Sequence, residues 1–199
     1  MRRLCMLFMA LLCAANVSAQ VSARDWIDGL NYTLDERYAL FMKVDAYGEE
    51  INGYFMVEGD SYYIQLGIME VYSDGELRYE INNERKEVTE DRVNLTSRDL
   101  LTNPTRAFEF VEEEFTATIS ENIHNGVILK LVPKQSADIT AVYVSMVWRD
   151  GRIIPLAIKY DYDGEEVAIA LVMADSQSAV MPRWNKNNYK SYKYSKSRR

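Results

Sequence analysis

The sequence predicts a mainly β (α+β) protein whose chain forms one large curved antiparallel sheet, or a barrel, of about eleven strands. From Tyr38 onward the chain consists of short segments in which side chains alternate with a period of two. Clusters of Asp, Gly and Asn separate these segments, and such residues tolerate positive φ and close tight turns. Only two segments break this pattern with helical spacing.

The turn signals divide the chain into its expected strands. The expected turns lie at residues 47–50, 58–60, 73–75, 82–83, 125–126, 150–151 and 163–164. The strands between them are expected at residues 40–46, 51–57, 62–66, 70–72, 76–81, 87–93, 115–120, 127–132, 140–149, 152–160 and 165–173.

The first interruption is an expected amphipathic helix over residues 23–34, where Trp26, Ile27, Leu30 and Leu34 recur at helical intervals. The second covers residues 96–111. There Pro104 ends one helical stretch and can open another. These helices interrupt a sheet that is otherwise continuous.

Several strands carry large apolar side chains on both faces, as in Tyr54 to Val57 and Tyr143 to Trp148. An antiparallel sheet with one solvated face alternates more cleanly. Either one face packs on the helices while the other packs on something else, or the sheet curves around an apolar cavity. The 14 Tyr and 9 Met residues are compatible with an adaptable cavity wall, but composition alone favours an ordinary core rimmed by tyrosines.

The chain start has the pattern of a cleaved secretory signal peptide over residues 1–19, with Arg2 and Arg3 before an apolar run and a small-residue cleavage site. Both cysteines, Cys5 and Cys13, lie in this leader, and Leu at the position before Cys13 disfavours lipidation there. We expect a single domain over residues 20–180, a basic C-terminal tail over residues 181–199, and a periplasmic location.

Charge is distributed unevenly along the chain. The formal net charge is -7, but residues 181–199 carry seven basic side chains and no acidic one, so the body between leader and tail is near −16. An acidic body argues against nucleic-acid binding, for which a basic face is expected. The tail is expected to be a solvated end; contact with anionic lipid or an acidic partner is the alternative.

The order of these pieces resembles the LolA-like family of periplasmic outer-membrane lipoprotein carriers. The resemblance rests on Gly53 to Val57, on the Ser-Asp-Gly turn within Val71 to Tyr79, on Asn103-Pro104, on Leu129 to Lys134, and on the hairpin from Ile139 to Leu156. It covers most of the chain after the leader. It implies an unclosed antiparallel β-barrel with a lid of short helices, that is, a half-barrel domain over residues 20–180.

The resemblance also implies a function, namely a monomeric chaperone that holds the acyl chains of lipoproteins in an apolar cavity and carries them toward the outer membrane. Its implied partners are an inner-membrane donor complex and an outer-membrane acceptor, and it implies no cofactor. Some members of the family carry a basic residue on the first strand that holds the lid shut, and Lys43 lies near the corresponding position in this sequence. The candidate lipid-binding wall is Phe41, Phe55, Ile64, Leu66, Met69, Tyr79, Met146 and Trp148, and the candidate lid is Trp26, Leu30, Leu100, Leu101 and Phe108.

Other functional classes receive less support from the residues. His124 is the single histidine, and no nucleophile motif accompanies it, so we expect no enzyme. Residues 161–166 lack the spacing of a calcium loop and are expected to form a hairpin turn. Glu112 to Glu114 is expected to be a solvated strand entrance, and the sequons at Asn31 and Asn94 carry little information. An envelope sensor or scaffold of the same fold, binding lipid or protein without transport, remains the alternative.

Overall fold

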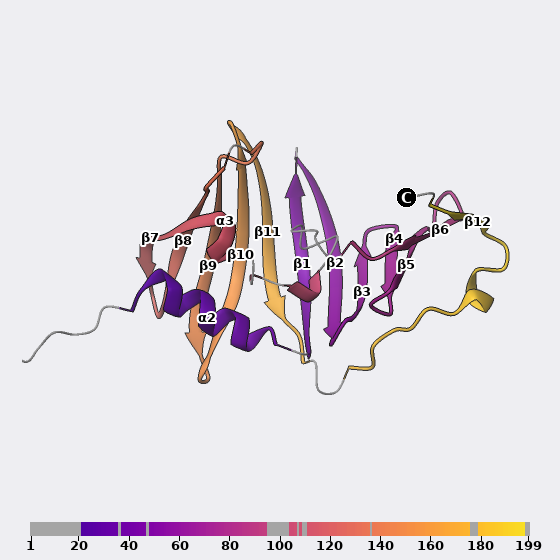
Figure 1. Cartoon of the computed structure of the whole chain (residues 1–199), viewed down its shortest axis with the longest axis horizontal. Coiled ribbons are helices and arrows are strands. Elements are labelled where there is room, and N and C mark those ends of the chain that lie inside the picture. The colour runs from indigo at the N-terminus through magenta and orange to yellow at the C-terminus, as the bar shows by residue number, and fades with distance from the viewer. Residues whose placement is uncertain are drawn as a thin grey trace, which may run out of the picture.

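One twelve-stranded sheet dominates the structure (Figure 1). The structure is a computed structural model that describes residues 21–197 except 36, 47, 95–103, 107, 109–110, 136 and 176–178. The strands are β1 (Arg37–Ala46), β2 (Glu49–Glu58), β3 (Ser61–Leu66), β4 (Met69–Ser73), β5 (Leu77–Asn82), β6 (Glu87–Arg92), β7 (Phe115–Ile123), β8 (Gly126–Pro133), β9 (Ala141–Arg149), β10 (Arg152–Tyr162), β11 (Glu165–Met173) and β12 (Lys193–Lys196).

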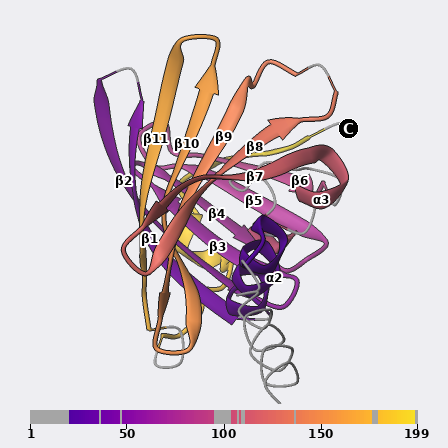
Figure 2. The same cartoon turned by 90° about the vertical axis from the view of Figure 1, so that its left-hand side faces the viewer.

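The sheet is unclosed, as the resemblance implied. Its strand order is β12-β6-β5-β4-β3-β2-β1-β11-β10-β9-β8-β7, so β12 and β7 are the two edges. Neighbouring strands are antiparallel except for β12, which runs parallel to β6. Viewed from the β7 end, the twisted strands fan out above the helix α2 (Figure 2). All eleven expected strands are confirmed, and β12 was not foreseen.

Turn chemistry explains most of the hairpins. Asn125, Asp150 and Asp163 have φ of 54°, 51° and 55°, the left-handed conformation that Asn and Asp tolerate better than other residues with a Cβ. The turn expected at residues 82–83 is longer than predicted, because its left-handed residue is Lys86, with φ of 53°.

The two faces of the sheet carry two separate hydrophobic clusters. We call the face on which α2 packs the inner face and the opposite one the outer face. On β1, Leu40 and Met42 belong to the inner cluster, whereas Ala39 belongs to the outer one. Since both faces are covered, large apolar residues on both sides of a strand are explained by two packing partners.

Helix α2 (Ala23–Thr33) lies across the inner face in Figure 1. Ser22 caps its first turn, and its hydroxyl and backbone N–H both contact Asp25, which forms a capping box. The helix buries Ile27 and Leu30 in the inner cluster. The expected helix is therefore confirmed, ending at Thr33.

The structure describes only part of the second expected helical interruption, residues 96–111. Its described parts are the 3-10 turn η1 (Pro104–Arg106) and the helix α3 (Val111–Glu114). Phe108 and Val111 pack into the inner cluster. The remainder of the span, including Thr96, falls outside the described residues.

The C-terminal segment packs against the outer face, and we call residues 179–197 the strap. Trp184 stacks on Tyr79 of β5, with ring centroids 4.4 Å apart, and on Tyr189 at 5.1 Å. After the 3-10 turn η2 (Lys186–Tyr189), β12 pairs with β6. The expectation of a solvated end is therefore wrong for this segment, because its aromatic side chains cover apolar strand residues.

The basic residues of the strap pair with the acidic body. Arg183 lies 3.2 Å from Glu58, and Lys196 lies 2.7 Å from Glu90. The Arg183–Glu58 pair is exposed and contributes only about 0–1 kcal/mol, and in the Lys196–Glu90 pair the lysine remains 70% exposed. The aromatic contacts therefore dominate the attachment. The acidic partner considered for the basic segment is thus, in this structure, the sheet of the same chain.

Glu70 forms the polar centre of the strap interface. Its carboxylate accepts hydrogen bonds from Tyr72 at 2.7 Å, from Asn83 at 2.7 Å and from Tyr189 at 3.2 Å. Burial raises the pKa of Glu70, but these hydrogen bonds outweigh burial and hold the pKa below its ordinary value. The ionised carboxylate therefore joins β4 to the strap.

This arrangement predicts a pH dependence of stability. Because the pKa of Glu70 is lower in the folded than in the unfolded chain, its contribution is present above about pH 4.5 and is lost as the pH falls through the folded-state value. We expect Glu70→Gln to flatten the decline of the urea midpoint between about pH 6 and pH 3. Glu84→Gln, at an exposed hairpin position, is the control. An unchanged slope in Glu70→Gln would contradict the role of Glu70.

Candidate functional site

The inner face is a continuous apolar surface built by cross-strand neighbours. Leu40, Phe55, Ile64 and Val71 are successive partners on β1, β2, β3 and β4, so their side chains form one row. Each of them is at most 8% exposed. This row meets α2 and Phe108 in a single cluster, so the chain fills the inner face with its own side chains.

Five of the predicted wall residues pack together on this face. Phe55, Ile64 and Met146 are buried in the cluster, and Leu66 packs against it. Met69 is the cross-strand partner of Leu66 and is half-buried.

The other three wall residues do not join them. Phe41 lies on the outer face, 55% exposed, with its ring 5.1 Å from that of Tyr54. Tyr79 lies under Trp184 of the strap. Trp148 lies on the inner face, as the cross-strand partner of Ile153, but it is 56% exposed near the end of β9 and outside the buried cluster. The sequence did not separate the faces, because a shift of one residue in register inverts them.

The lid residues that the structure describes lie where a cover is required. Leu30 is fully buried, Trp26 packs against the inner cluster, and Phe108 is 9% exposed within it. Leu100 and Leu101 lie outside the described residues. Gly29 allows the close approach of α2 to β10, because a Cβ there would lie 2.4 Å from Cδ1 of Ile153.

Tyr38 contacts the segment that carries η1, a contact that the sequence analysis did not predict. Its hydroxyl donates a 2.6 Å hydrogen bond to the carbonyl oxygen of Pro104, and the side chain is only 1% exposed. Burial raises the pKa of Tyr38, which keeps the hydroxyl neutral and able to donate. Lys43, the residue near the expected latch, instead contacts Glu50 on β2 at 2.5 Å. Tyr38 therefore ties the lid segment to β1.

The two helices of the lid also contact each other and the sheet. Arg24 of α2 lies 3.0 Å from Glu112 of α3. The Lys134 amine, just after β8, donates to the carbonyl oxygen of Glu112 at 2.6 Å. Both contacts are exposed, so each contributes little to the free energy of folding. They orient α3 beside α2 and β8 without holding it strongly.

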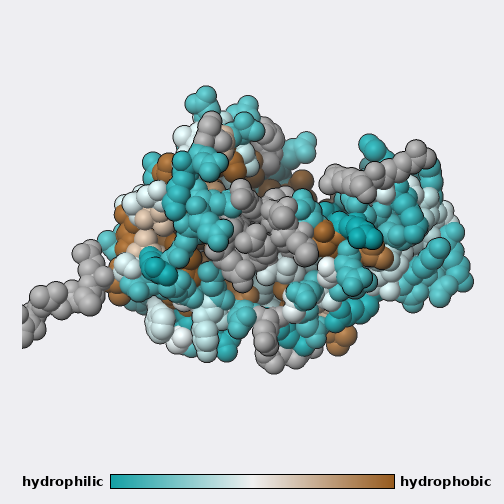
Figure 3. Space-filling view, viewed as in Figure 1, coloured by the Kyte–Doolittle hydropathy of each residue, from teal (hydrophilic) through white to brown (hydrophobic). Residues whose placement is uncertain are grey.

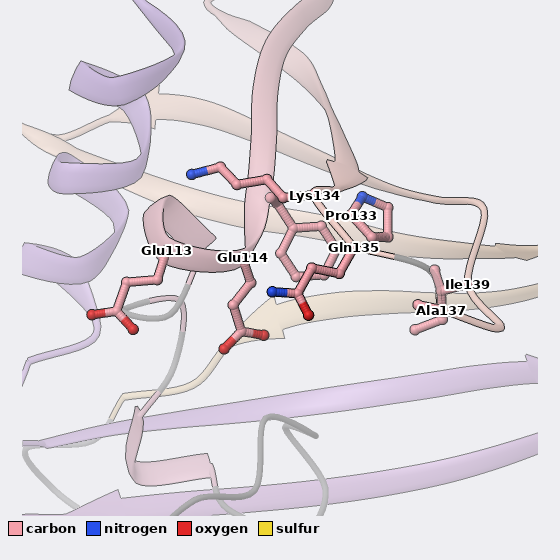
Figure 4. Close-up of a pocket in the computed structure, with 8 residues that line it drawn as sticks. Glu113, Glu114, Pro133, Lys134, Gln135, Ala137 and Ile139 are labelled. Atoms are coloured by element: carbon pink, nitrogen blue, oxygen red, sulfur yellow. The ribbon is translucent and has the colours of Figure 1, made fainter.

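A pocket of about 380 Å³ opens beside α3 (Figure 4). Glu114 and Lys134 lie at its rim, while Phe115 and Ile139 line it and also pack against the inner cluster. In Figure 3, hydrophobic surface gathers at this end of the molecule, whereas the end formed by β4–β6 and β12 is mostly hydrophilic. The pocket thus leads from solvent toward the apolar inner face.

The structure adds no support for a metal site, a calcium loop or histidine-based catalysis among the described residues. Within the described ranges, no group of three or more His, Cys, Asp and Glu side chains could hold a metal ion. Residues 161–166 form the β10–β11 hairpin, whose turn contains Asp163 and Gly164. His124 is exposed, and its Nε2 lies 3.3 Å from Nδ2 of Asn125. In the part of the chain that the structure describes, no helix is long and apolar enough to cross a membrane.

Comparison with solved structures places the fold among known ones. A conserved uncharacterised protein from Thermus thermophilus superposes with a TM-score of 0.55 at 9% identity, over 88% of this chain and 99% of the other. LprF from Mycobacterium bovis gives 0.46 at 10% identity, over 81% and 96%. A LolA superfamily protein from Nitrosomonas europaea gives 0.36 at 8% identity, over 85% and 98%.

These likenesses concern the fold alone. No protein-family profile matches the sequence, nor does any curated protein sequence. The class that fold and site define is an unclosed antiparallel half-barrel with an apolar inner face covered by helices, the LolA-like architecture that the sequence motifs predicted.

Proposed function

We propose that this protein is a periplasmic carrier that shelters the acyl chains of lipoproteins on its inner face and moves them toward the outer membrane. The observation that carries the proposal is the lid. An amphipathic helix, α2, occupies an apolar sheet face with side chains that an acyl chain can replace. Transport further requires a donor and an acceptor, and the resemblance to the lipoprotein carriers is the support for those partners.

The energetics favour exchange of the lid for lipid. Burial of Ile27, Leu30 and Leu34 stabilises the closed lid by about 5–9 kcal/mol, at about 1.5–3 kcal/mol for each side chain. One acyl chain with about 15 methylenes gains roughly 12 kcal/mol on leaving water, at about 0.8 kcal/mol each. An acyl chain therefore gains more than the burial of these three side chains contributes, so lipid can compete with α2 for the inner face, and the empty protein still hides its apolar face.

Direct binding of an acyl probe tests the first half of the proposal. We expect a dansyl-labelled fatty acid to show a saturable, blue-shifted fluorescence increase with the purified protein, because the probe moves from water to an apolar site. Palmitate is expected to displace it. Absence of both signals would contradict the proposal.

Extraction of a lipoprotein from membranes separates the carrier from the alternative, an envelope sensor or scaffold of the same fold without transport. We expect the purified protein to release a lipoprotein from inner-membrane vesicles in a soluble complex. Probe binding without release would favour the sensor or scaffold. The exposed Phe41 surface on the outer face is the observation that favours a protein partner for this alternative.

A further inference from the structure

The inner face changes from apolar to polar along a single cross-strand row. The row runs through Val57 on β2, Tyr62 on β3, Ser73 on β4 and Arg78 on β5. Val57 and Tyr62 belong to the inner hydrophobic cluster. Ser73 is one of few buried polar residues in the described chain, at 7% exposed. The row thus brings a cation to the margin of an apolar surface, with Asp91 on β6 as the next cross-strand partner.

The Arg78 guanidinium uses little of its hydrogen-bonding capacity. Its side chain is 16% exposed, and its Nη2 donates to the Glu80 carboxylate at 3.1 Å. Its Nε is buried and has no hydrogen-bond partner in the described structure. A guanidinium carries five N–H donors, and a buried charge without full pairing is costly. Asp91, its partner across β6, accepts from the backbone N–H of Arg92 at 2.8 Å.

Two hydroxyl groups lie beside this cation. Tyr62 and Ser73 are cross-strand partners, and Ser73 Oγ accepts from the backbone N–H of Gly75 at 3.1 Å. Burial raises the pKa of Tyr62, while the positive charge of Arg78 acts in the opposite direction, which reflects their proximity. A neutral phenol, a serine hydroxyl and a guanidinium therefore line one end of the inner face.

We propose that Arg78, with Tyr62 and Ser73, binds the anionic headgroup, a carboxylate or a phosphate, of an amphiphile whose acyl chains lie on the inner face. This inference rests on the acyl-binding part of the proposed function and extends its ligand class to anionic amphiphiles, because lipoprotein acyl chains, held in ester and amide linkages, carry no free carboxylate or phosphate. The guanidinium fork matches both headgroups, and the unpaired Nε is a donor ready for the second oxygen. β3 and β5 are about 10 Å apart, two strand spacings, so a headgroup at Arg78 places the first methylenes beside Tyr62 and Ile64.

The test compares amphiphiles that share a chain and differ in headgroup. Palmitate, palmitoyl lysophosphatidate and hexadecanol each displace the dansyl fatty-acid probe from the full-length mature protein. We expect either anionic amphiphile to bind at least roughly tenfold more tightly than hexadecanol, the effect of one charge-assisted hydrogen bond. The tighter of the two identifies a carboxylate or a phosphate as the preferred headgroup.

Variants of Arg78 test whether its side chain causes the preference for anionic amphiphiles. Arg78→Gln is expected to remove it while leaving hexadecanol affinity unchanged, and Arg78→Lys to keep only part of it, because Lys lacks the fork. Arg85→Gln, at an exposed hairpin position, is the matched control and keeps the preference. If Arg78→Gln does not fold, Arg78→Lys still tests the fork.

The outcomes separate this inference from the proposed function. Equal affinity for all three amphiphiles, or a preference that survives in Arg78→Gln, overturns the inference and leaves the acyl carrier standing. Binding of none of the three by the wild-type protein overturns both. A preference for hexadecanol also overturns the inference, since the acidic neighbours Glu80 and Asp91 would then exclude anions.

Discussion

A disulfide between positions 29 and 153 is expected to abolish acyl-chain binding. A Cβ at Gly29 would lie 3.8 Å from Cβ of Ile153, the mean separation in natural disulfides. Because Gly29 is on α2 and Ile153 is on β10, the bond holds the lid on the inner face. We expect oxidised Gly29→Cys/Ile153→Cys to lose the saturable fluorescence of the dansyl probe and reduction to restore it.

The comparison of the oxidised and reduced forms of one protein is the main control. Any strain from the new side chain at Gly29 is present in both forms, so a difference in binding reports the cross-link alone. Both natural cysteines, Cys5 and Cys13, precede Gln20, and a chain that starts there contains only the engineered pair. Equal binding by the two forms would mean that α2 does not move when lipid binds, which would contradict the lid mechanism.

The strands were predictable because their information is local. Period-two alternation and left-handed turn residues such as Asn125 and Asp163 depend on near neighbours in the sequence, and the structure confirms every strand that they delimit. The order of these strands carried the resemblance, and with it the unclosed sheet, whereas the N-terminal helix was predicted from the helical spacing of its own apolar residues.

It was harder to predict which face of the sheet a side chain lies on and which residue it contacts, because both depend on residues distant in the sequence. Phe41 and Ile64 are equally apolar in sequence, yet register alone places one on the outer and the other on the inner face. The Tyr38–Pro104 hydrogen bond joins residues 66 positions apart, and no motif announces it. Arg78 was likewise unremarkable until the row across β3 and β4 placed it beside buried side chains.

The strap shows a signal that was available and was interpreted differently. Its basic charge suggested a solvated end. Four aromatic residues, Trp184, Tyr189, Tyr192 and Tyr194, recur among those charges, and the last two alternate as in a strand. Glu87 and Glu90 on β6 supply the complementary charge. The basic composition of the segment favours a solvated end. The free energy gained by burying the aromatic rings against the sheet outweighs that preference.

Truncation of the strap anchor is expected to cause the largest loss of stability. Trp184 lies between the rings of Tyr79 and Tyr189 and covers Tyr72 at 6.0 Å. Because the indole is only partly buried, we expect Trp184→Ala to lower the free energy of unfolding by about 2–4 kcal/mol, toward the lower end for buried Trp. The melting temperature, followed by circular dichroism, should fall by about 5–10 °C.

Two comparisons give this expectation its meaning. Val180→Ala changes a strap residue that is 88% exposed, and its stability should stay within about 0.5 kcal/mol of the wild type. Trp184→Phe keeps part of the stack and should fall between the two. Since the strap and the lid cover opposite faces, folded Trp184→Ala should bind the acyl probe with unchanged affinity at a temperature below its transition. If Trp184→Ala melts at the same temperature as the wild-type protein, the strap contributes no stability. If Trp184→Ala binds the probe more weakly, the two faces are coupled through the sheet.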